Sequence, residues 1–201
     1  MDENVKVLFL DPAGGIAGDM VLAGVTGLGF DPAPVQSALN AAGVDVTITP
    51  EPRTIKGIAG FGVRIAYAPD QPLRHLADLT NIVDACGAPQ SVAKRANAAL
   101  TRLAQVEAAV HGATLESVHF HEVGGIDSMV DIIGTFICIE QLGITRVHAS
   151  TVPLGSGFID CAHGRIPVPV PATLAILEGI PVTGSDATTE IVTPKIGRAH
   201  V

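Results

Sequence analysis

The sequence has no tryptophan, a single tyrosine and only three cysteines among its 201 residues. With so few aromatic side chains, the hydrophobic core must be built from Ala, Val, Ile and Leu, and a 47% hydrophobic content is enough to form one. The number of cysteines is odd, and no two of them form a Cys-x-x-Cys motif. They therefore argue against a disulfide framework and fit a reducing cytosol.

Basic residues are also scarce. The sequence has 12 Lys and Arg but 20 Asp and Glu, which gives a net charge of −8. This balance disfavours nucleic acid as a partner, since phosphate backbones require a basic face. The amino terminus is not a secretory signal, because its apolar run stops at Asp11. No stretch is long and uncharged enough to span a bilayer, so we expect a cytoplasmic protein without a membrane partner. A Gly-x-Ser-x-Gly elbow is absent too, which disfavours acyl-transferring serine enzymes.

Hydrophobic periodicity and turn residues predict strands that alternate with helices. We expect strands at residues 5–10, 44–48, 62–67, 146–154 and 158–167, and another strand that carries His119. We expect helices from near Asp19 and over residues 31–43, 75–86, 91–110, 127–142 and 171–178. This alternation predicts an α/β fold, a mixed sheet with packed helices. Residues 1–194 form one region, with a subdomain boundary left open near residues 70–90.

The densest polar cluster lies in residues 118–131, in otherwise apolar or glycine-rich sequence. His119 and His121 are two apart, so both side chains leave the same face of an extended strand. Asp127 and Asp131 are four apart, which places them on one face of the following helix. Imidazole and carboxylate groups are ligands that nickel and zinc accept. A purely structural role as solvated caps is the alternative, but a carboxylate on so apolar a helix is costly unless paired or bound to a cation. The cluster therefore predicts a metal or substrate site.

A glycine-rich turn follows the first predicted strand and holds Asp11, Gly14, Gly15, Gly18 and Asp19. Such a turn can aim backbone amides at an anion, and the next helix dipole adds attraction. The spacing matches neither a dinucleotide-binding fingerprint nor a phosphate-binding Walker loop. A tight turn with Asp19 as a first-turn acid is an equally good interpretation.

Two further sites carry candidate ligands. Cys161 and His163 are two apart and would share a strand face as a soft metal-binding pair. We take His163 as a candidate ligand and leave Cys161 open, because cysteine is commonly buried. His111 ends a helix, where an imidazolium is favoured by the dipole, so a structural role is at least as good an explanation.

Together these segments resemble the LarC family of nickel-insertion proteins. The His-Phe-His-Glu-Val-Gly run at residues 119–124 is the most specific part of the resemblance, and the glycine turn is much less specific. Further matching segments lie at residues 8–11, 14–20, 107–112, 127–132, 153–157, 163–164, 167–173 and 193–194. The resemblance thus runs in family order through almost the whole chain.

The resemblance implies an α/β nickel chelatase, or cyclometallase, of the lyase class. Such proteins insert nickel into pyridinium-3,5-bisthiocarboxylic acid mononucleotide in a CTP-dependent reaction that closes a nickel–carbon bond. The product is the nickel-pincer nucleotide of lactate racemase. The matching residues become candidates for three roles: His111, His119, His121 and His163 as metal ligands, Glu122, Asp127 and Asp131 as catalytic groups, and Asp11, Gly14, Gly15, Gly18 and Asp19 as phosphate contacts.

One departure concerns the end of the chain. Family members continue past Thr193-Pro194 into a region linked to CTP binding with Mg or Mn, whereas here residues 195–201 follow. We expect these last residues to be an artefactual tail and the chain to be an amino-terminal portion, with the missing region among its partners and a homo-oligomer left open. The alternatives are a metal-dependent hydrolase of a phosphorylated small molecule and a non-catalytic metal-binding scaffold.

Overall fold

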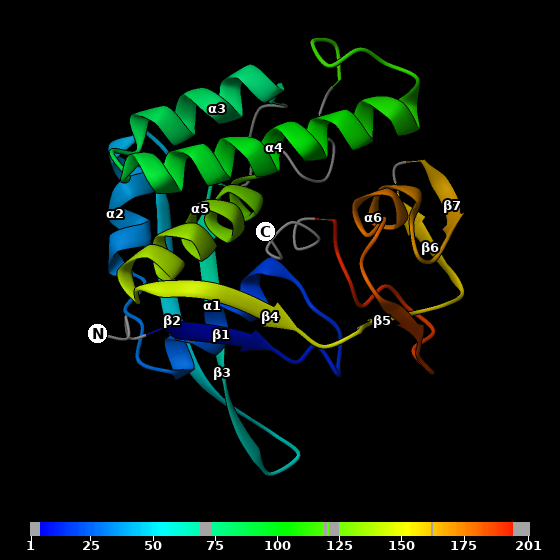
Figure 1. The fold of residues 1–201 in the computed structure, drawn as a ribbon, viewed down its shortest axis with the longest axis horizontal. Helices are drawn as coiled ribbons and strands as arrows, with labels where there is room; N and C mark the ends of the chain where they lie inside the picture. Colours follow the sequence, from blue (N-terminus) through cyan, green and yellow to red (C-terminus); the bar gives the residue numbers. More distant parts are fainter. Residues whose placement is uncertain (1–4, 69–73, 119, 121–124, 162, 195–201) are drawn as a thin grey trace. The chain divides into compact units, whose positions relative to one another are not determined.

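The computed structural model describes residues 5–68, 74–118, 120, 125–161 and 163–194. Helices and strands alternate along the chain, which confirms the predicted α/β class (Figure 1). The strands form four two-stranded sheets in the described part of the chain, two parallel and two antiparallel. Two compact units divide the chain, one made of residues 1–17 and 144–201 and the other of residues 18–143. Residues 70–90, where the sequence left a boundary open, lie inside the second unit.

The continuous unit, residues 18–143, is built around its last helix. Its elements are α1 (Gly18–Gly27), α2 (Ala33–Ala41), β2 (Val46–Ile55), β3 (Ile58–Tyr67), α3 (Leu76–Ala85), α4 (Gln90–His111) and α5 (Ile126–Gln141). Helix α5 packs against α1, α2 and α4, and α3 lies along α4 (Figure 1). Every residue of α5 from Ser128 to Ile139 is buried, because the helix is apolar on nearly all sides.

Local signals explain where the helices begin and end. Asp31 precedes α2, and its Oδ1 accepts a 2.9 Å hydrogen bond from the backbone amide of Ala33, as expected of a residue at a helix start. The chain leaves α2 through Gly43, at a φ of 78°, and leaves α4 through Gly112, at a φ of 62°. Both values are left-handed, a conformation that glycine adopts without strain.

Strands β2 and β3 pair antiparallel over their whole length, a pairing that the sequence left undecided. Strand β2 extends through Pro50 and Pro52, where the sequence indicated a connection. A two-stranded sheet has an outer edge on each strand, and proline is tolerated where no ladder hydrogen bond is required. Lys56 and Gly57 form the turn with φ values of 50° and 85°, the positive pair that tight hairpins favour.

The discontinuous unit, residues 1–17 and 144–201, contains the other three sheets and one helix. Its elements are β1 (Lys6–Leu10), β4 (Ile144–Ala149), β5 (Val152–Leu154), β6 (Phe158–Cys161), β7 (Gly164–Pro167), α6 (Pro171–Ile176) and β8 (Val182–Gly184). Strand β1 pairs parallel with β4, β5 parallel with β8, and β6 antiparallel with β7. The long strand expected at 158–167 is therefore a hairpin, with Gly164 at a φ of 84° entering β7.

None of the helices within the described residues combines the length and the hydropathy needed to cross a membrane.

Candidate functional site

Asp11 lies immediately after β1, at the carboxyl end of its parallel pair with β4. Its side chain is exposed, and its Oδ1 accepts a 2.7 Å hydrogen bond from the hydroxyl of Ser150, which follows β4. The backbone amide of Ser150 donates to the carbonyl of Leu10 over 3.0 Å, so the two strand ends are held together. Ligands of α/β proteins commonly bind at such strand ends. Asp11 is thus placed as the sequence predicted.

The two glycines of the turn have different environments. Gly15 is buried at a φ of +98°, and a Cβ there would overlap the backbone carbonyl of Ile191. Its amide donates a 2.8 Å hydrogen bond to the carbonyl of Pro12, which closes the turn. Gly14 is exposed, and a Cβ there would meet no atom within 4 Å. The packing of the turn therefore explains why position 15 is a glycine, whereas Gly14 is accessible to a ligand.

Asp131 of α5 lies directly against Gly18, the first residue of α1. The carboxylate is 5% exposed, and a Cβ on Gly18 would overlap the Cβ and the carboxyl carbon of Asp131. The amino-terminal end of a helix carries partial positive charge, which favours an anion at this position. This contact brings together the end of the glycine-rich segment and the acidic helix, two features that the sequence could only place separately. Asp19, the next residue, is exposed in the first turn of α1.

Helix α5 also carries a buried polar stripe, formed by Ser128, Asp131 and Thr135. Their spacing of three and four residues places them on one helix face. Their exposed fractions are 0%, 5% and 7%, respectively. The Ser128 hydroxyl has no hydrogen-bond partner among the residues that the structure describes. Ser128 was not among the residues predicted from the sequence, although its position three residues before Asp131 could have indicated it.

The remaining residues of the polar cluster are only partly described. Asp127 is half-buried in the first turn of α5, and its Oδ1 lies beside the Cα of Gly125, the residue that precedes the helix. An acid at this position is stabilised by the helix dipole. His119, His121 and Glu122 lie outside the described residues.

The other two candidate histidines lie in different units. His111 is in the last turn of α4, and its Nε2 is 3.3 Å from the carboxylate of Glu107 one turn earlier. This contact with Glu107 is a structural explanation for His111. His163 is exposed between β6 and β7. Within residues 5–68, 74–118, 120, 125–161 and 163–194, no three His, Cys, Asp or Glu residues are grouped so as to hold a metal ion.

The cysteines differ in accessibility, which gives a testable prediction. Cys86 and Cys138 are buried, and burial raises the pKa of the Cys138 thiol to about 12. Its reactive thiolate is then roughly one part in ten thousand at pH 8. Cys161 is half-buried, and its Sγ donates to the carbonyl of Gly164 over 3.5 Å. We expect iodoacetamide at pH 8 to label Cys161 alone in the folded protein. Mass spectrometry should find three labelled thiols after unfolding, and native labelling of Cys138 would contradict the packing of α5.

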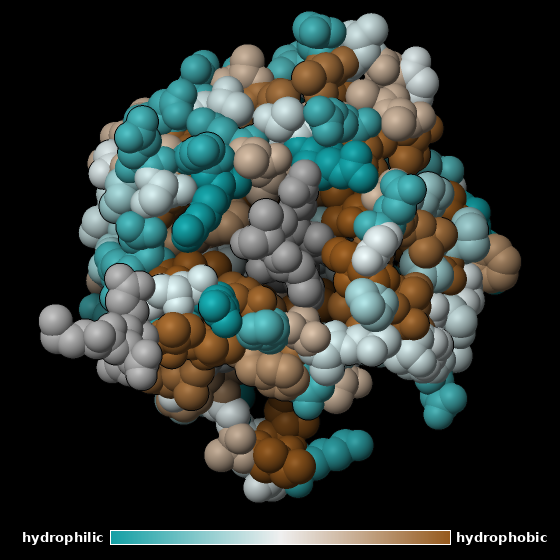
Figure 2. All heavy atoms as spheres, in the orientation of Figure 1, coloured by the Kyte–Doolittle hydropathy of each residue, from teal (hydrophilic) through white to brown (hydrophobic). Residues whose placement is uncertain are grey.

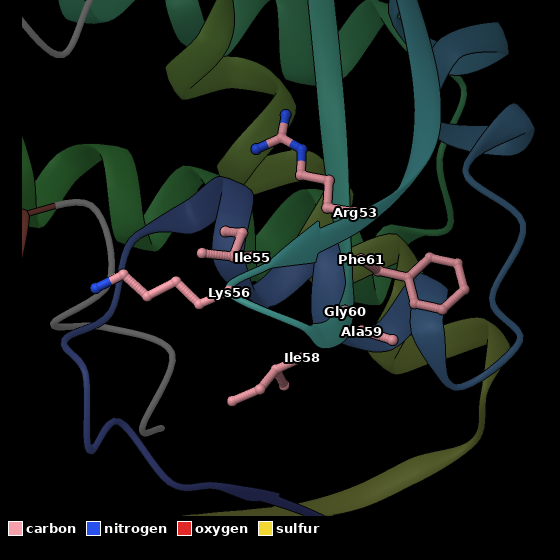
Figure 3. Close-up of a pocket in the computed structure, with 7 residues that line it drawn as sticks. All are labelled: Arg53, Ile55, Lys56, Ile58, Ala59, Gly60 and Phe61. Carbon is pink, nitrogen blue, oxygen red and sulfur yellow. The ribbon is translucent and has the colours of Figure 1, made fainter.

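A pocket of about 440 Å³ lies at the tip of the β2–β3 hairpin. Ile55, Lys56 and Ile58 extend to one side of the hairpin and Phe61 to the other (Figure 3). Ile55 and Ile58 are 68% and 77% exposed, and apolar atoms are visible at the tip in Figure 2. None of the candidate residues that the structure describes lines this pocket.

The family model and the individual relatives that match this chain indicate the same family. The family model described as "Nickel insertion protein" matches residues 8–199. A Geotalea daltonii protein whose name refers to nickel insertion is 42% identical over 193 residues, covering 94% of this chain. A Staphylococcus epidermidis protein named "Pyridinium-3,5-bisthiocarboxylic acid mononucleotide nickel insertion protein" is 40% identical over 190 residues, again covering 94% of this chain.

The matched regions cover 50% of the Geotalea daltonii protein and 48% of the Staphylococcus epidermidis protein. The chain therefore spans about half the length of these relatives. No solved structure is significantly similar to it.

Proposed function

The chain belongs to the nickel insertion protein family, and we propose that it takes part in inserting nickel into pyridinium-3,5-bisthiocarboxylic acid mononucleotide. The proposal rests on the substrate named for its Staphylococcus epidermidis relative. Nickel and the thiolated nucleotide are both substrates of this reaction. We infer that CTP, with Mg or Mn, is required and that the half of the relatives not matched by this chain supplies its binding. The product is the nickel-pincer nucleotide, the cofactor of lactate racemase.

His119 and His121 are the nickel ligands in this proposal, with His163 as a further candidate. Neutral imidazole suits nickel, and two histidines with one intervening residue share a strand face. His111 is the weakest candidate, because Glu107 already lies 3.3 Å from its ring.

The contact between Gly18 and Asp131 is the observation that carries the proposal. It places a buried carboxylate where the glycine-rich segment enters α1, in the same helix as Asp127. A carboxylate against Gly18 would repel a phosphate, so we assign the phosphate contact to the exposed Gly14 instead. Asp11, in the same unit as Gly14, would contact the phosphate through a divalent cation, since hard cations bind carboxylate and phosphate oxygens together. Asp19 is a separate candidate for such a contact.

The chemical step requires a base. When the pyridinium carbon bonds to nickel, its C–H bond breaks and the proton must leave. Glu122, Asp127 and Asp131 are the first three carboxylates that follow His121 in the sequence, and a positioned carboxylate can accept this proton. Closing a metal–carbon bond in this way is cyclometallation, and we therefore propose the lyase class for this reaction.

Nickel binding under anaerobic conditions tests the proposal. We expect the His119→Ala/His121→Ala variant to bind nickel more than about 100-fold more weakly than the wild type, because losing two ligands costs more than losing an outer-shell partner. Equilibrium dialysis measures this affinity. His148→Ala is the matched control, because His148 is an exposed histidine on β4 outside the candidate site. Equal affinity of the double variant and the wild type would exclude both histidines as ligands.

Reconstitution tests the reaction itself. The chain is incubated anaerobically with nickel, CTP and the thiolated nucleotide, with and without the half of the Staphylococcus epidermidis relative that it does not match, and the full-length relative is the positive control. Formation of the nickel-pincer product is followed by mass spectrometry. Hydrolysis of a phosphorylated substrate without nickel would favour a metal-dependent hydrolase.

A further inference from the structure

The outer end of the β2–β3 hairpin, residues 52–61, forms an arm that projects from the continuous unit (Figure 1). Every residue of this arm is exposed, whereas Val46, Ile48 and Val63 at the other end of the hairpin are buried. The core of the unit therefore holds only the base of the hairpin. The arm is not needed to complete that core, so its length requires another explanation.

The arm carries an exposed apolar cluster at its tip. Ile55 and Ile58 pair directly across the hairpin beside the turn, so their side chains lie on the same face. Both line the pocket described above, together with Gly60, where a Cβ would meet no atom within 4 Å. The bare backbone of Gly60 therefore leaves room for an incoming side chain. Single exposed apolar residues are ordinary, but a cluster beside a pocket indicates an interaction surface.

The arm is also basic, in contrast to the rest of its unit. Arg53 and Lys56 are its charged residues, and it contains no acid. Glu51, which precedes the arm, lies 3.2 Å from Arg53 and 2.6 Å from Arg64, so one carboxylate is shared between two guanidinium groups. Outside residues 51–64, the continuous unit has 12 acidic and four basic residues. The arm and the rest of the unit therefore carry charge of opposite sign.

One part of this unit has acids and no basic residue at all. Residues 18–50, which include α1 and α2, contain Asp19, Asp31 and Asp45 but no Lys or Arg. All three acids are exposed. Leu28, three residues before Asp31, is 78% exposed, so an apolar side chain accompanies the acids. This acidic segment is complementary to the basic and apolar arm.

We propose that the arm of one copy docks on the acidic segment, residues 18–50, of a second copy, so that the chain forms a dimer by exchanging arms. Two arms that met tip to tip would repel each other, because each carries Arg53 and Lys56. In a two-fold dimer each arm instead meets the acidic segment of the other copy, and the contact is made twice. The net charge of −8 opposes binding of the arm to an anionic lipid surface.

Analytical ultracentrifugation of the whole chain tests this proposal. We expect a dimer with a dissociation constant on the order of 10 μM, because two short arms form the contact. Ile55→Asp/Ile58→Asp should raise this constant more than about 30-fold, since a few buried anchors dominate such interfaces. Phe158→Asp/Leu174→Asp is the matched control, because it replaces two exposed apolar residues of the other unit and changes the net charge equally.

Two further measurements separate the role of charge from that of folding. Arg53→Glu/Lys56→Glu should weaken the dimer about tenfold or more, and added NaCl should weaken the wild-type dimer. A shortened hairpin, with Asn-Gly in place of residues 54–59, closes at the Arg53–Gly60 pair, two pairs before Ile55–Ile58 and therefore in the same hydrogen-bonding register. This variant should be a monomer with the circular dichroism spectrum of the wild type.

Carbodiimide cross-linking of mixed unlabelled and isotopically labelled chains locates the contact. We expect Lys56 of one copy to be joined to Asp19, Asp31 or Asp45 of the other. A wild type that stays monomeric at about 200 μM, or a dimer that the arm variants leave unchanged, would overturn the proposal. So would Lys56 cross-links confined to a single copy. Binding of a monomeric wild type to phosphatidylserine vesicles, lost when the hairpin is shortened, would overturn it in favour of a lipid surface.

Discussion

Replacing Gly15 with alanine is expected to destabilise the protein by on the order of 3 kcal/mol. Two costs combine at this position. The φ of +98° is strained for any residue with a Cβ, and the added methyl would overlap the carbonyl of Ile191. That carbonyl belongs to the backbone and accepts a 2.8 Å hydrogen bond from the amide of Ile16, so it has little freedom to move.

Urea unfolding measures this effect, with Gly14→Ala as the matched control. A Cβ at Gly14 would meet no atom within 4 Å, so we expect a change within about 0.5 kcal/mol. The pair also tests the glycine turn as a phosphate site. Gly14→Ala should keep stability and lose affinity for the nucleotide, because the methyl group occupies the space proposed for the phosphate. Full stability in Gly15→Ala would show that the turn is not packed against Ile191 as described.

The second large effect is expected from Gly18→Ala, at about 2–3 kcal/mol. The new methyl would collide with the Cβ and the carboxyl carbon of Asp131, which are not at the end of a flexible side chain. Relief therefore requires α1 and α5 to move apart, in a contact between buried residues. Because Asp131 would be displaced, nickel insertion in the reconstituted reaction should fall as well.

Gly24→Ala provides the comparison for this substitution. Gly24 lies in the same helix and is exposed, and a methyl group added there would meet no atom within 4 Å. Alanine is the better helix former by about 0.5–1 kcal/mol, so this variant should be slightly more stable than the wild type. Thermal unfolding of both variants separates helix propensity from packing. Equal melting temperatures would contradict the close approach of α1 and α5.

Local pattern was sufficient to predict the helices and, except for the end of α1, their bounds to within two residues. Helix α4 spans Gln90–His111 where the sequence indicated 91–110, because its apolar spacing and Gly112 both act within a few residues. The placement of single residues was likewise predictable, since Asp11 follows β1 and Asp131 lies on a buried helix. Such features depend on residues that are close in the sequence, so they can be predicted from the sequence alone.

Contacts between distant segments could not be predicted in this way. The packing of Gly18 on Asp131 joins residues 113 positions apart, and either residue alone has an ordinary local explanation. The contact between the His75 ring and the carbonyl oxygen of Val118 is of the same kind. Strand β8, Val182–Gly184, is only three residues long and is defined by its pairing with β5 rather than by alternation. Tertiary structure, not local propensity, determines these features.

The parallel pairing of β1 with β4 has a consequence for synthesis on the ribosome. Lys6 is translated long before its partner Ile144, and the whole of residues 18–143 is made in between. The continuous unit can therefore fold before β4, the partner strand of β1, has been synthesised, since domains generally fold as they emerge from the ribosome. The unit that contains Asp11, Gly14 and Gly15 is assembled last, after the later strands have been synthesised.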